Sequence, residues 1–223
     1  MKDIFVTERA LIFANGDPYP GEMVRRTLDE TPDAHIIAAD GGARIARFYG
    51  YTPHVIIGDM DSLTPDDLTH FVQAGAILER FPAEKVETDL ELALKYVARQ
   101  GVRWLRIVGA IGNRFDQTIA NVHLLTLPEL LTIDAAMVSG GQAVYVLRPG
   151  THILRGQPGD TLSLIPMNGA AEGIETQELK YPLHKETLIF GPARGVSNVF
   201  STEQAQISFT GGILLAVHTV GRA

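Results

Sequence analysis

Two stretches of the sequence decide the fold: HIIAADGG at residues 35–42 and VIIGDMDS at residues 55–62. Each is a short run of apolar residues that ends in glycine and aspartate. A run that is apolar at every position, rather than at alternate positions, is typical of a strand buried on both faces of a parallel sheet. Helices must then cover the two faces of that sheet.

Similar apolar runs recur through the first 139 residues, at residues 10–14, 76–78, 105–108 and 135–138. Between them lie segments with helical spacing of apolar residues. The sequence therefore predicts an N-terminal α/β domain built on a parallel sheet.

Start signals precede three of the expected helices. Thr64 can cap a helix whose first residue is Pro65, and residues 88–91, TDLE, have the pattern of a capping box. Asn113 can cap a third helix, with Ile119 on its apolar face.

The pattern changes after Gly140. Short strand-like pieces, separated by turns rich in Gly, Pro and Asn, lie at residues 143–147, 152–154, 161–165, 187–190, 205–209 and 213–218. Many short strands without helices predict a small all-β sandwich or barrel. We expect an α/β domain over residues 1–139 and an all-β sandwich domain over residues 140–223.

The amino-acid composition argues against several classes of function. The 223-residue chain has a net charge of −7 and no block of basic residues, so we expect no nucleic-acid partner. No apolar run approaches the roughly 18 residues of a membrane span, and because residues 1–5 lack a cationic start before a long apolar stretch we expect no signal peptide. Cysteine is absent, which excludes disulfides and is compatible with the cytoplasm. We expect a cytoplasmic protein that does not interact with membranes.

Acidic loops follow four of the predicted strands. Asp40 follows residues 35–39, Asp59 and Asp61 follow residues 55–57, and Asp89 comes a loop after the run that starts at residue 76. The fourth loop, residues 109–117, follows residues 105–108 and contains Asp116. The carboxyl ends of parallel strands lie at one edge of a sheet, where open α/β sheets bind ligands. We therefore expect these loops to converge.

The residue types suit a metal–nucleotide complex. Asp59 and Asp61 can both face one hard cation, and Mg²⁺ is normally held by such oxygens together with substrate phosphates. Gly41 and Gly42 can expose backbone N–H groups to phosphate, and Arg114 offers a two-pronged donor to phosphate oxygens.

Each motif alone also has an ordinary explanation. Asp40 with its glycines could form a turn, Thr88 and Asp89 could serve only as a helix cap, and a D-x-D loop occurs in several unrelated transferases. The P-loop, histidine-rich zinc and G-x-S-x-G patterns are absent. The coincidence of four strand-end loops favours a functional site.

Taken in order, these loops resemble the thiamine pyrophosphokinase family. The matching pieces are residues 13–16, 39–43, 57–62, 84–94, 109–121, 179–183 and 195–198. No single piece is decisive, but the series covers nearly the whole chain.

The resemblance implies an α/β domain followed by a β-sandwich, in a homodimer whose active site lies between subunits. It implies transfer of the pyrophosphoryl group of ATP to the hydroxyl of thiamine, giving thiamine diphosphate and AMP, with Mg²⁺ as cofactor. Matching motif positions make Asp40, Asp59, Asp61 and Asp89 the metal ligands, and Asp59, Asp61, Asp89 and Arg114 the catalytic residues.

The residues expected to bind the substrates are Asn15, Asp40, Gly41, Gly42, Ser62, Thr88, Asn113, Asp116, Gln117, Ser197 and Asn198. Independently of the family pattern, we expect Tyr181 or Phe200 to flank the pyrimidine ring of thiamine.

Two positions depart from the family pattern: Val86 stands where aspartate is common, and Gln117 where histidine is common. Two alternatives remain open from the sequence. One is a thiamine- or nucleotide-binding protein that has lost turnover, and the other is a different magnesium-dependent nucleotide transferase that uses the D-x-D loop.

Overall fold

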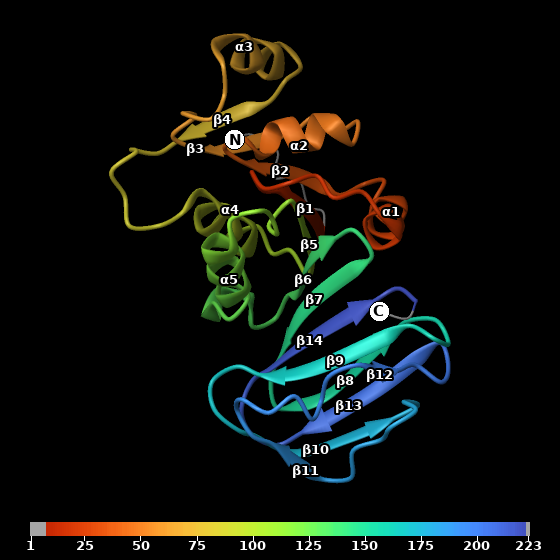
Figure 1. Ribbon diagram of the computed structural model, residues 1–223. Helices are drawn as coiled ribbons and strands as arrows, with labels where there is room; N and C mark the ends of the chain where they lie inside the picture. Colours follow the sequence, from red (N-terminus) through yellow and green to blue (C-terminus); the bar gives the residue numbers. More distant parts are fainter. Residues whose placement is uncertain (1–7, 222–223) are drawn as a thin grey trace. The chain divides into compact units, whose positions relative to one another are not determined.

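The computed structural model describes residues 8–221, and the expectation about residues 1–5 lies outside that range (Figure 1). The chain forms two compact units, of which the first ends at Gly140 and the second begins at Gly141. Within the described residues, no helix combines the length and the apolar character that crossing a membrane requires.

The first unit is built on a parallel sheet. Its strands are β1 (Arg9–Phe13), β2 (His35–Ala39), β3 (Val55–Gly58), β4 (Ile77–Arg80), β5 (Trp104–Val108) and β6 (Asp134–Ser139). They lie in the order β6-β5-β1-β2-β3-β4, and each neighbouring pair is parallel. The chain moves outward from β1 to β4 and then crosses to β5 on the other side of β1. The strand order therefore reverses between β1 and β5.

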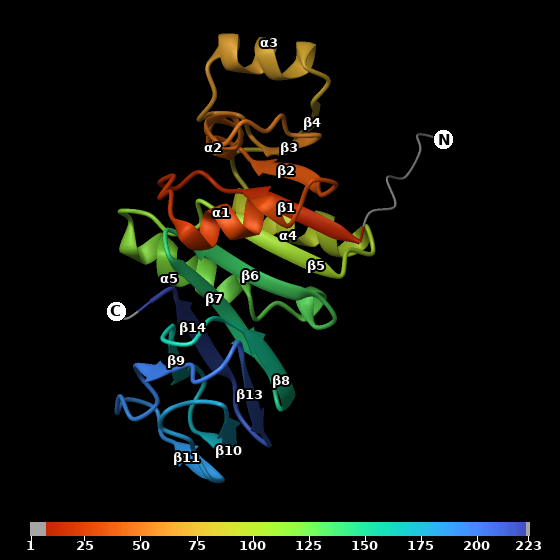
Figure 2. The same ribbon diagram turned by 90° about the vertical axis from the view of Figure 1, so that its right-hand side faces the viewer.

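Helices cover both faces of this sheet, α1 and α2 on one side and α4 and α5 on the other (Figures 1 and 2). Their bounds are α1 (Glu22–Asp29), α2 (Gly42–Phe48), α3 (Pro65–Gln73), α4 (Asp89–Arg99) and α5 (Phe115–Leu124), with a 3-10 turn at Pro128–Leu130. Every residue of β3 is buried, and so are all but the first residues of β1, β2 and β5. This burial explains why the strands are apolar at every position, and it confirms the predicted α/β class.

The helix starts agree only partly with the prediction. Thr64 caps α3, and Asp67 returns the bond to the Thr64 backbone, so this start is a complete capping box. At α4, Thr88 Oγ1 accepts the Glu91 N–H at 3.2 Å, but the Glu91 carboxylate pairs with Lys95 instead of closing the box.

The start of α5 was predicted wrongly. Its N-cap position is Arg114, not Asn113, and no side chain caps it. None of residues 115–124, all of them described, is fully buried, and Ile119 is 43% exposed.

The second unit contains two antiparallel sheets, with the strand orders β12-β9-β14-β7 and β11-β10-β13-β8. The strands are β7 (Gln142–Leu147), β8 (Gly150–Arg155), β9 (Thr161–Pro166), β10 (Ala171–Gln177), β11 (Glu186–Leu188), β12 (Asn198–Val199), β13 (Gln204–Phe209) and β14 (Leu214–Thr219). One buried core takes side chains from both sheets, including Leu164, Leu214, Ile174 and Ile207. No helix lies within residues 141–221. The second unit is thus an all-β sandwich.

Strands β10 and β12 were not predicted. In β10 the pairing with β11 shifts register between Ala171 and Ile174, and Gly173 has a φ of 65°. Two buried residues therefore lie three positions apart, which breaks the alternation by which a strand is recognised. Strand β12 has only two residues, too few to show any pattern.

Candidate active site

A cavity of about 480 Å³ opens at the carboxyl ends of the strands in the first unit. Its lining comes from residues 14–17 after β1, 39 and 40 at the end of β2, 59, 61 and 62 after β3, 88–90 at the start of α4, and parts of 109–121 after β5. The loops after β1 and β5 flank the point where the strand order reverses, the usual ligand position in such folds. The volume is in the range of small-molecule sites.

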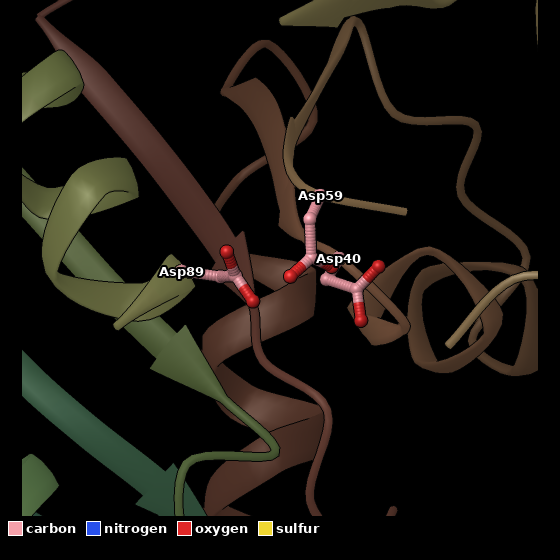
Figure 3. Close-up of side chains that lie close together, drawn as sticks. All are labelled: Asp40, Asp59 and Asp89. Carbon is pink, nitrogen blue, oxygen red and sulfur yellow. The ribbon is translucent and has the colours of Figure 1, made fainter. Parts of the chain in front are cut away.

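Three carboxylates converge in this cavity. Asp40, Asp59 and Asp89 each offer an oxygen, and these oxygens lie within 4.8 Å of one another. Figure 3 shows the three side chains gathered in one place. They come from the end of β2, the end of β3 and the first turn of α4. We call Asp40, Asp59 and Asp89 the carboxylate group below.

Asp40 is held in a position that folding alone does not explain. It is only 3% exposed, and its Oδ1 has no hydrogen-bond partner among the described residues. Its φ of 46° is a left-handed conformation, which costs an aspartate about 1 kcal/mol. A buried carboxylate oxygen without a partner is unfavourable unless a cation or a donor completes it.

Gly58 lets the carboxylates come this close. A Cβ at Gly58 would lie 2.9 Å from Asp89 Oδ1 and 3.0 Å from Asp40 Cβ, and its φ of 151° also disfavours other residues. The last residue of β3 must therefore be glycine for Asp40 and Asp89 to meet beside it.

Lys85 neutralises part of the carboxylate group. Its Nζ lies 2.9 Å from Asp89 Oδ1 and 3.5 Å from Asp59 Oδ2, and its side chain is 12% exposed. The resemblance included Lys85 in a matching piece, but sequence reasoning gave it no role. The available signal was its spacing of four residues from Asp89.

The crowded surroundings shift the pKa values of Asp89 and Asp59 in opposite directions. Burial raises the pKa of Asp89 above its usual 3.8, and the neighbouring Asp40 and Asp59 charges add to this while Lys85 opposes it. The backbone N–H of Asp61 and then Lys85 lower the pKa of Asp59. The surroundings of Asp89 thus oppose its negative charge, whereas those of Asp59 favour it.

The residues present fit a hard divalent cation. The carboxylate group supplies oxygen ligands, and no histidine or cysteine belongs to it. Asp40 Oδ1 and Asp89 Oδ1 are both buried without a hydrogen bond among the described residues, although the Lys85 ammonium lies 2.9 Å from Asp89 Oδ1. Oxygen-only sets suit Mg²⁺.

Asp61 lines the same cavity but is not part of the carboxylate group among the described residues. The backbone turns at Met60, whose φ is 71°, and the Asp61 N–H then donates to Asp59 Oδ1 at 3.1 Å. The Asp61 carboxylate accepts from Ser62 Oγ at 3.1 Å, and Ser62 Oγ accepts from Asn15 Nδ2 at 3.2 Å. The structure therefore groups Asp59 with Asp40 and Asp89, and it links Asp61 to Ser62 and Asn15.

The loop after β5 also lines the cavity. Asn113, Arg114 and Gln117 are among its lining residues, as is Thr88 at the start of α4. Arg114 pairs with Asp116 at 2.6 Å, with both side chains 68% exposed, while Asp116 is not among the lining residues. The Arg114 guanidinium is thus held by a two-pronged pair with an exposed carboxylate, and solvent screens the attraction between the two charges.

Asp17 and Tyr19 join this loop to the loop after β1. Asp17 Oδ2 accepts the Asn113 N–H at 2.9 Å, and Tyr19 Oη donates to Asn113 Oδ1 at 3.3 Å. Sequence reasoning missed both residues. Asp17 directly follows the matching piece at residues 13–16, which was the only signal for it.

Gly41 and Gly42 are not among the lining residues of the cavity. A Cβ at Gly42 would lie 1.9 Å from the Phe13 carbonyl oxygen, and one at Gly41 would lie 2.4 Å from Asn15 Oδ1. Their small size lets the start of α2 pack against the loop after β1. Packing therefore explains both glycines without a phosphate.

The predicted residues of the second unit differ in availability. Ser197 is exposed, with a φ of 61° and its N–H bound to Ser163 Oγ at 3.1 Å. Asn198 is buried, and its carboxamide holds the Tyr181 backbone through bonds of 3.0 and 2.7 Å. Asn198 thereby fixes Tyr181, which is 53% exposed.

The expectation for Phe200 is wrong, because the side chain is 1% exposed and belongs to the core of the second unit. A ring in that position cannot flank a ligand.

Comparisons with known proteins agree with this architecture. The profile described as "Thiamin pyrophosphokinase, catalytic domain" matches residues 30–134, and "Thiamin pyrophosphokinase, vitamin B1 binding domain" matches residues 151–214. The thiamine pyrophosphokinase of Bacillus subtilis is 26% identical over 184 residues, which span 82% of this chain and 86% of that protein.

Solved structures extend the likeness to three dimensions. The crystal structure of thiamin pyrophosphokinase from Geobacillus thermodenitrificans has a TM-score of 0.81 at 27% identity, covering 94% of this chain and 96% of that one. The Bacillus subtilis thiamine pyrophosphokinase structure shares the fold, with a TM-score of 0.84 at 22% identity, covering 95% and 99%.

The two matching profiles follow one another along the chain in the order of its two units. The chain belongs to the thiamine pyrophosphokinase family.

Proposed function

We propose that this enzyme transfers the pyrophosphoryl group of ATP to the hydroxyl of thiamine, giving thiamine diphosphate and AMP, at the cavity that contains the carboxylate group. The observation that carries the assignment to this cavity is the buried, unpartnered oxygen of Asp40 beside Asp59 and Asp89. A strand-end cavity with that charge pattern suits a cation–triphosphate complex.

The reaction requires alignment and charge compensation more than covalent help from the protein. The thiamine hydroxyl oxygen forms a bond to the β-phosphorus, and the bond from that phosphorus to the α–β bridging oxygen breaks. The bridging oxygen leaves with AMP, and the hydroxyl proton passes to a carboxylate of the cavity. Such transfers depend mainly on in-line positioning and electrostatic stabilisation.

Asp40, Asp59 and Asp89 would hold Mg²⁺, which when bound offsets the negative charge of the triphosphate. Asp61 lines the cavity without belonging to the carboxylate group, so it is available to orient the hydroxyl. Arg114 can leave its exposed pair with Asp116 and donate to phosphate oxygens. Asn15, Ser62, Thr88, Asn113 and Gln117 supply polar contacts along the walls.

The second unit is proposed to bind thiamine. Ser197 is exposed there, and Asn198 holds the exposed Tyr181 in place. We further propose that the protein is a cytoplasmic homodimer. In this dimer the second unit of one subunit would hold thiamine beside the cavity of its partner. The family resemblance supports the dimer, and the absence of cysteine is compatible with the cytoplasm.

Chromatographic detection of AMP and thiamine diphosphate from ATP, Mg²⁺ and thiamine tests the proposal. The wild-type protein should form both products in equal amounts, and Asp59→Asn should form neither while keeping its circular dichroism spectrum. Unchanged turnover in Asp59→Asn would refute the site. Calorimetric binding of thiamine without product would identify a binding protein, and release of another nucleotide would identify a different transferase.

A further inference from the structure

Lys85 stands out because a cation already lies in the carboxylate group. Its ammonium contacts Asp89 at 2.9 Å and Asp59 at 3.5 Å, and 12% of its side chain is exposed. Within the described residues no ion pair joins it to Asp40, whose buried Oδ1 has no hydrogen-bond partner there. One ammonium therefore faces two of three carboxylates, and it shares those two with any cation that enters.

We infer that Lys85 is the resident counterion of the carboxylate group, displaced from Asp59 and Asp89 when a divalent ion enters with a nucleotide. The inference rests on the proposed function. It makes Lys85 a positioning residue that opposes binding of the bare ion and favours binding of the ion together with a triphosphate.

The reason is electrostatic. With the ion alone, the ammonium and the ion repel one another and compete for the same Asp59 and Asp89 oxygens, in a partly buried site where such terms are large. With a triphosphate present, the phosphate oxygens give the displaced ammonium new acceptors. Lys85 thereby couples the two ligands, so that each favours binding of the other.

Direct binding of Mn²⁺, followed by electron paramagnetic resonance without nucleotide, tests the first half. Lys85→Gln should bind Mn²⁺ about tenfold more tightly than the wild type, since the competing charge is gone. Lys95→Gln is the matched control, because it removes the same charge from an ion pair with Glu87 and Glu91 that does not line the cavity. It should bind Mn²⁺ like the wild type. Equal or weaker binding by Lys85→Gln overturns the inference.

The same titration with α,β-methylene-ATP, whose α–β bridge resists cleavage, tests the coupling. After correction for Mn²⁺ bound to free nucleotide, the analogue should strengthen Mn²⁺ binding by a larger factor in the wild type than in Lys85→Gln. An equal factor in both proteins contradicts the coupling.

Displacement itself has a spectroscopic readout. In protein labelled with ¹³Cε-lysine, saturating Mg²⁺ and the analogue should shift the Lys85 signal, assigned by its loss in Lys85→Gln. The Lys95 signal should stay in place. An unmoved Lys85 signal overturns displacement.

Failure of the inference can be told apart from failure of the proposed function. If the wild type binds Mn²⁺, Asp59→Asn abolishes that binding and Lys85→Gln leaves it unchanged, only the role of Lys85 is wrong. If neither the wild type nor Lys85→Gln binds Mn²⁺ with or without the analogue, the metal site and the inference both fall.

Discussion

Each of the two units contains an aspartate that is only 3% exposed, and the two carboxylates differ in their hydrogen-bond partners. Asp160, in the second unit, accepts the N–H groups of Gly221 at 2.8 Å and Gln157 at 2.9 Å, and it pairs with His218 at 2.8 Å. Asp40, in the first unit, has an oxygen with no partner among the described residues. Burial alone does not identify a functional carboxylate.

The two aspartates differ in whether both carboxylate oxygens have hydrogen-bond partners among the described residues. The Asp160 carboxylate bonds both to the turn before β9 and to the chain after β14, so its charge stabilises the fold. The Asp40 carboxylate instead lines a cavity together with Asp59 and Asp89. Substitutions in the two units should therefore have different consequences.

The largest effect on stability is expected from Asp160→Asn. An amide cannot make all three hydrogen bonds that join the buried carboxylate to Gly221, Gln157 and His218, so the free energy of unfolding should fall by about 3 kcal/mol. Urea unfolding measures the change. Asp40→Asn is the matched substitution and should not lower the stability, because it removes charge from a crowded group. A comparable loss of stability in both variants would contradict the different roles assigned to Asp160 and Asp40.

Gly58→Ala should have the next largest effect. The added Cβ would meet the Asp89 carboxylate at 2.9 Å, and the φ of 151° is unfavourable for alanine. We expect a loss of about 2 kcal/mol in unfolding free energy and a fall of roughly tenfold or more in turnover. Gly159→Ala is a control at another positive φ, 96°, with no atom near the added Cβ. If both variants lose turnover equally, contact with the carboxylate group is not the cause.

Acid should affect the Asp160 region through linkage. The backbone N–H groups of Gly221 and Gln157 and the His218 contact lower the pKa of Asp160 below 3.8 despite its burial. A depressed folded-state pKa contributes stability that is present above the unfolded value and is lost as the pH falls through the folded value. Wild-type stability should therefore decline below about pH 4 more steeply than that of Asp160→Asn. Parallel curves for the two proteins would contradict this assignment.

The smallest effect is expected from Val86→Asp, which restores the residue common in the family. The Val86 side chain is 99% exposed and does not line the cavity. Turnover should change by less than about twofold, because an exposed charge is screened by solvent. A large gain in turnover would show that position 86 acts on the site.

Sequence periodicity was sufficient for the parallel sheet because β1, β2, β3 and β5 are buried on both faces and therefore apolar throughout. It failed at β10, where a shift of register breaks the alternation, and at α5, where Asn113 bonds to Tyr19 instead of capping the helix. Local patterns cannot show such long-range contacts.

The strand-end rule predicted that the acidic loops would meet, but it could not give the membership of the carboxylate group. The turn at Met60 separates Asp61 from Asp59, and Lys85 reaches the group from the loop before α4. Phe200 was one of two residues expected beside the pyrimidine ring, yet its side chain lies in the core of the second unit. Side-chain direction decides each of these cases.

The central claim is that Asp40, Asp59 and Asp89 take one divalent ion together with the nucleotide. The most direct measurement is a crystal structure with Mn²⁺ and α,β-methylene-ATP, using the anomalous signal of manganese. The account predicts a manganese peak in contact with an oxygen of each of the three aspartates and with the triphosphate. A bound nucleotide whose manganese lies away from Asp40, or a carboxylate group without manganese, would contradict it.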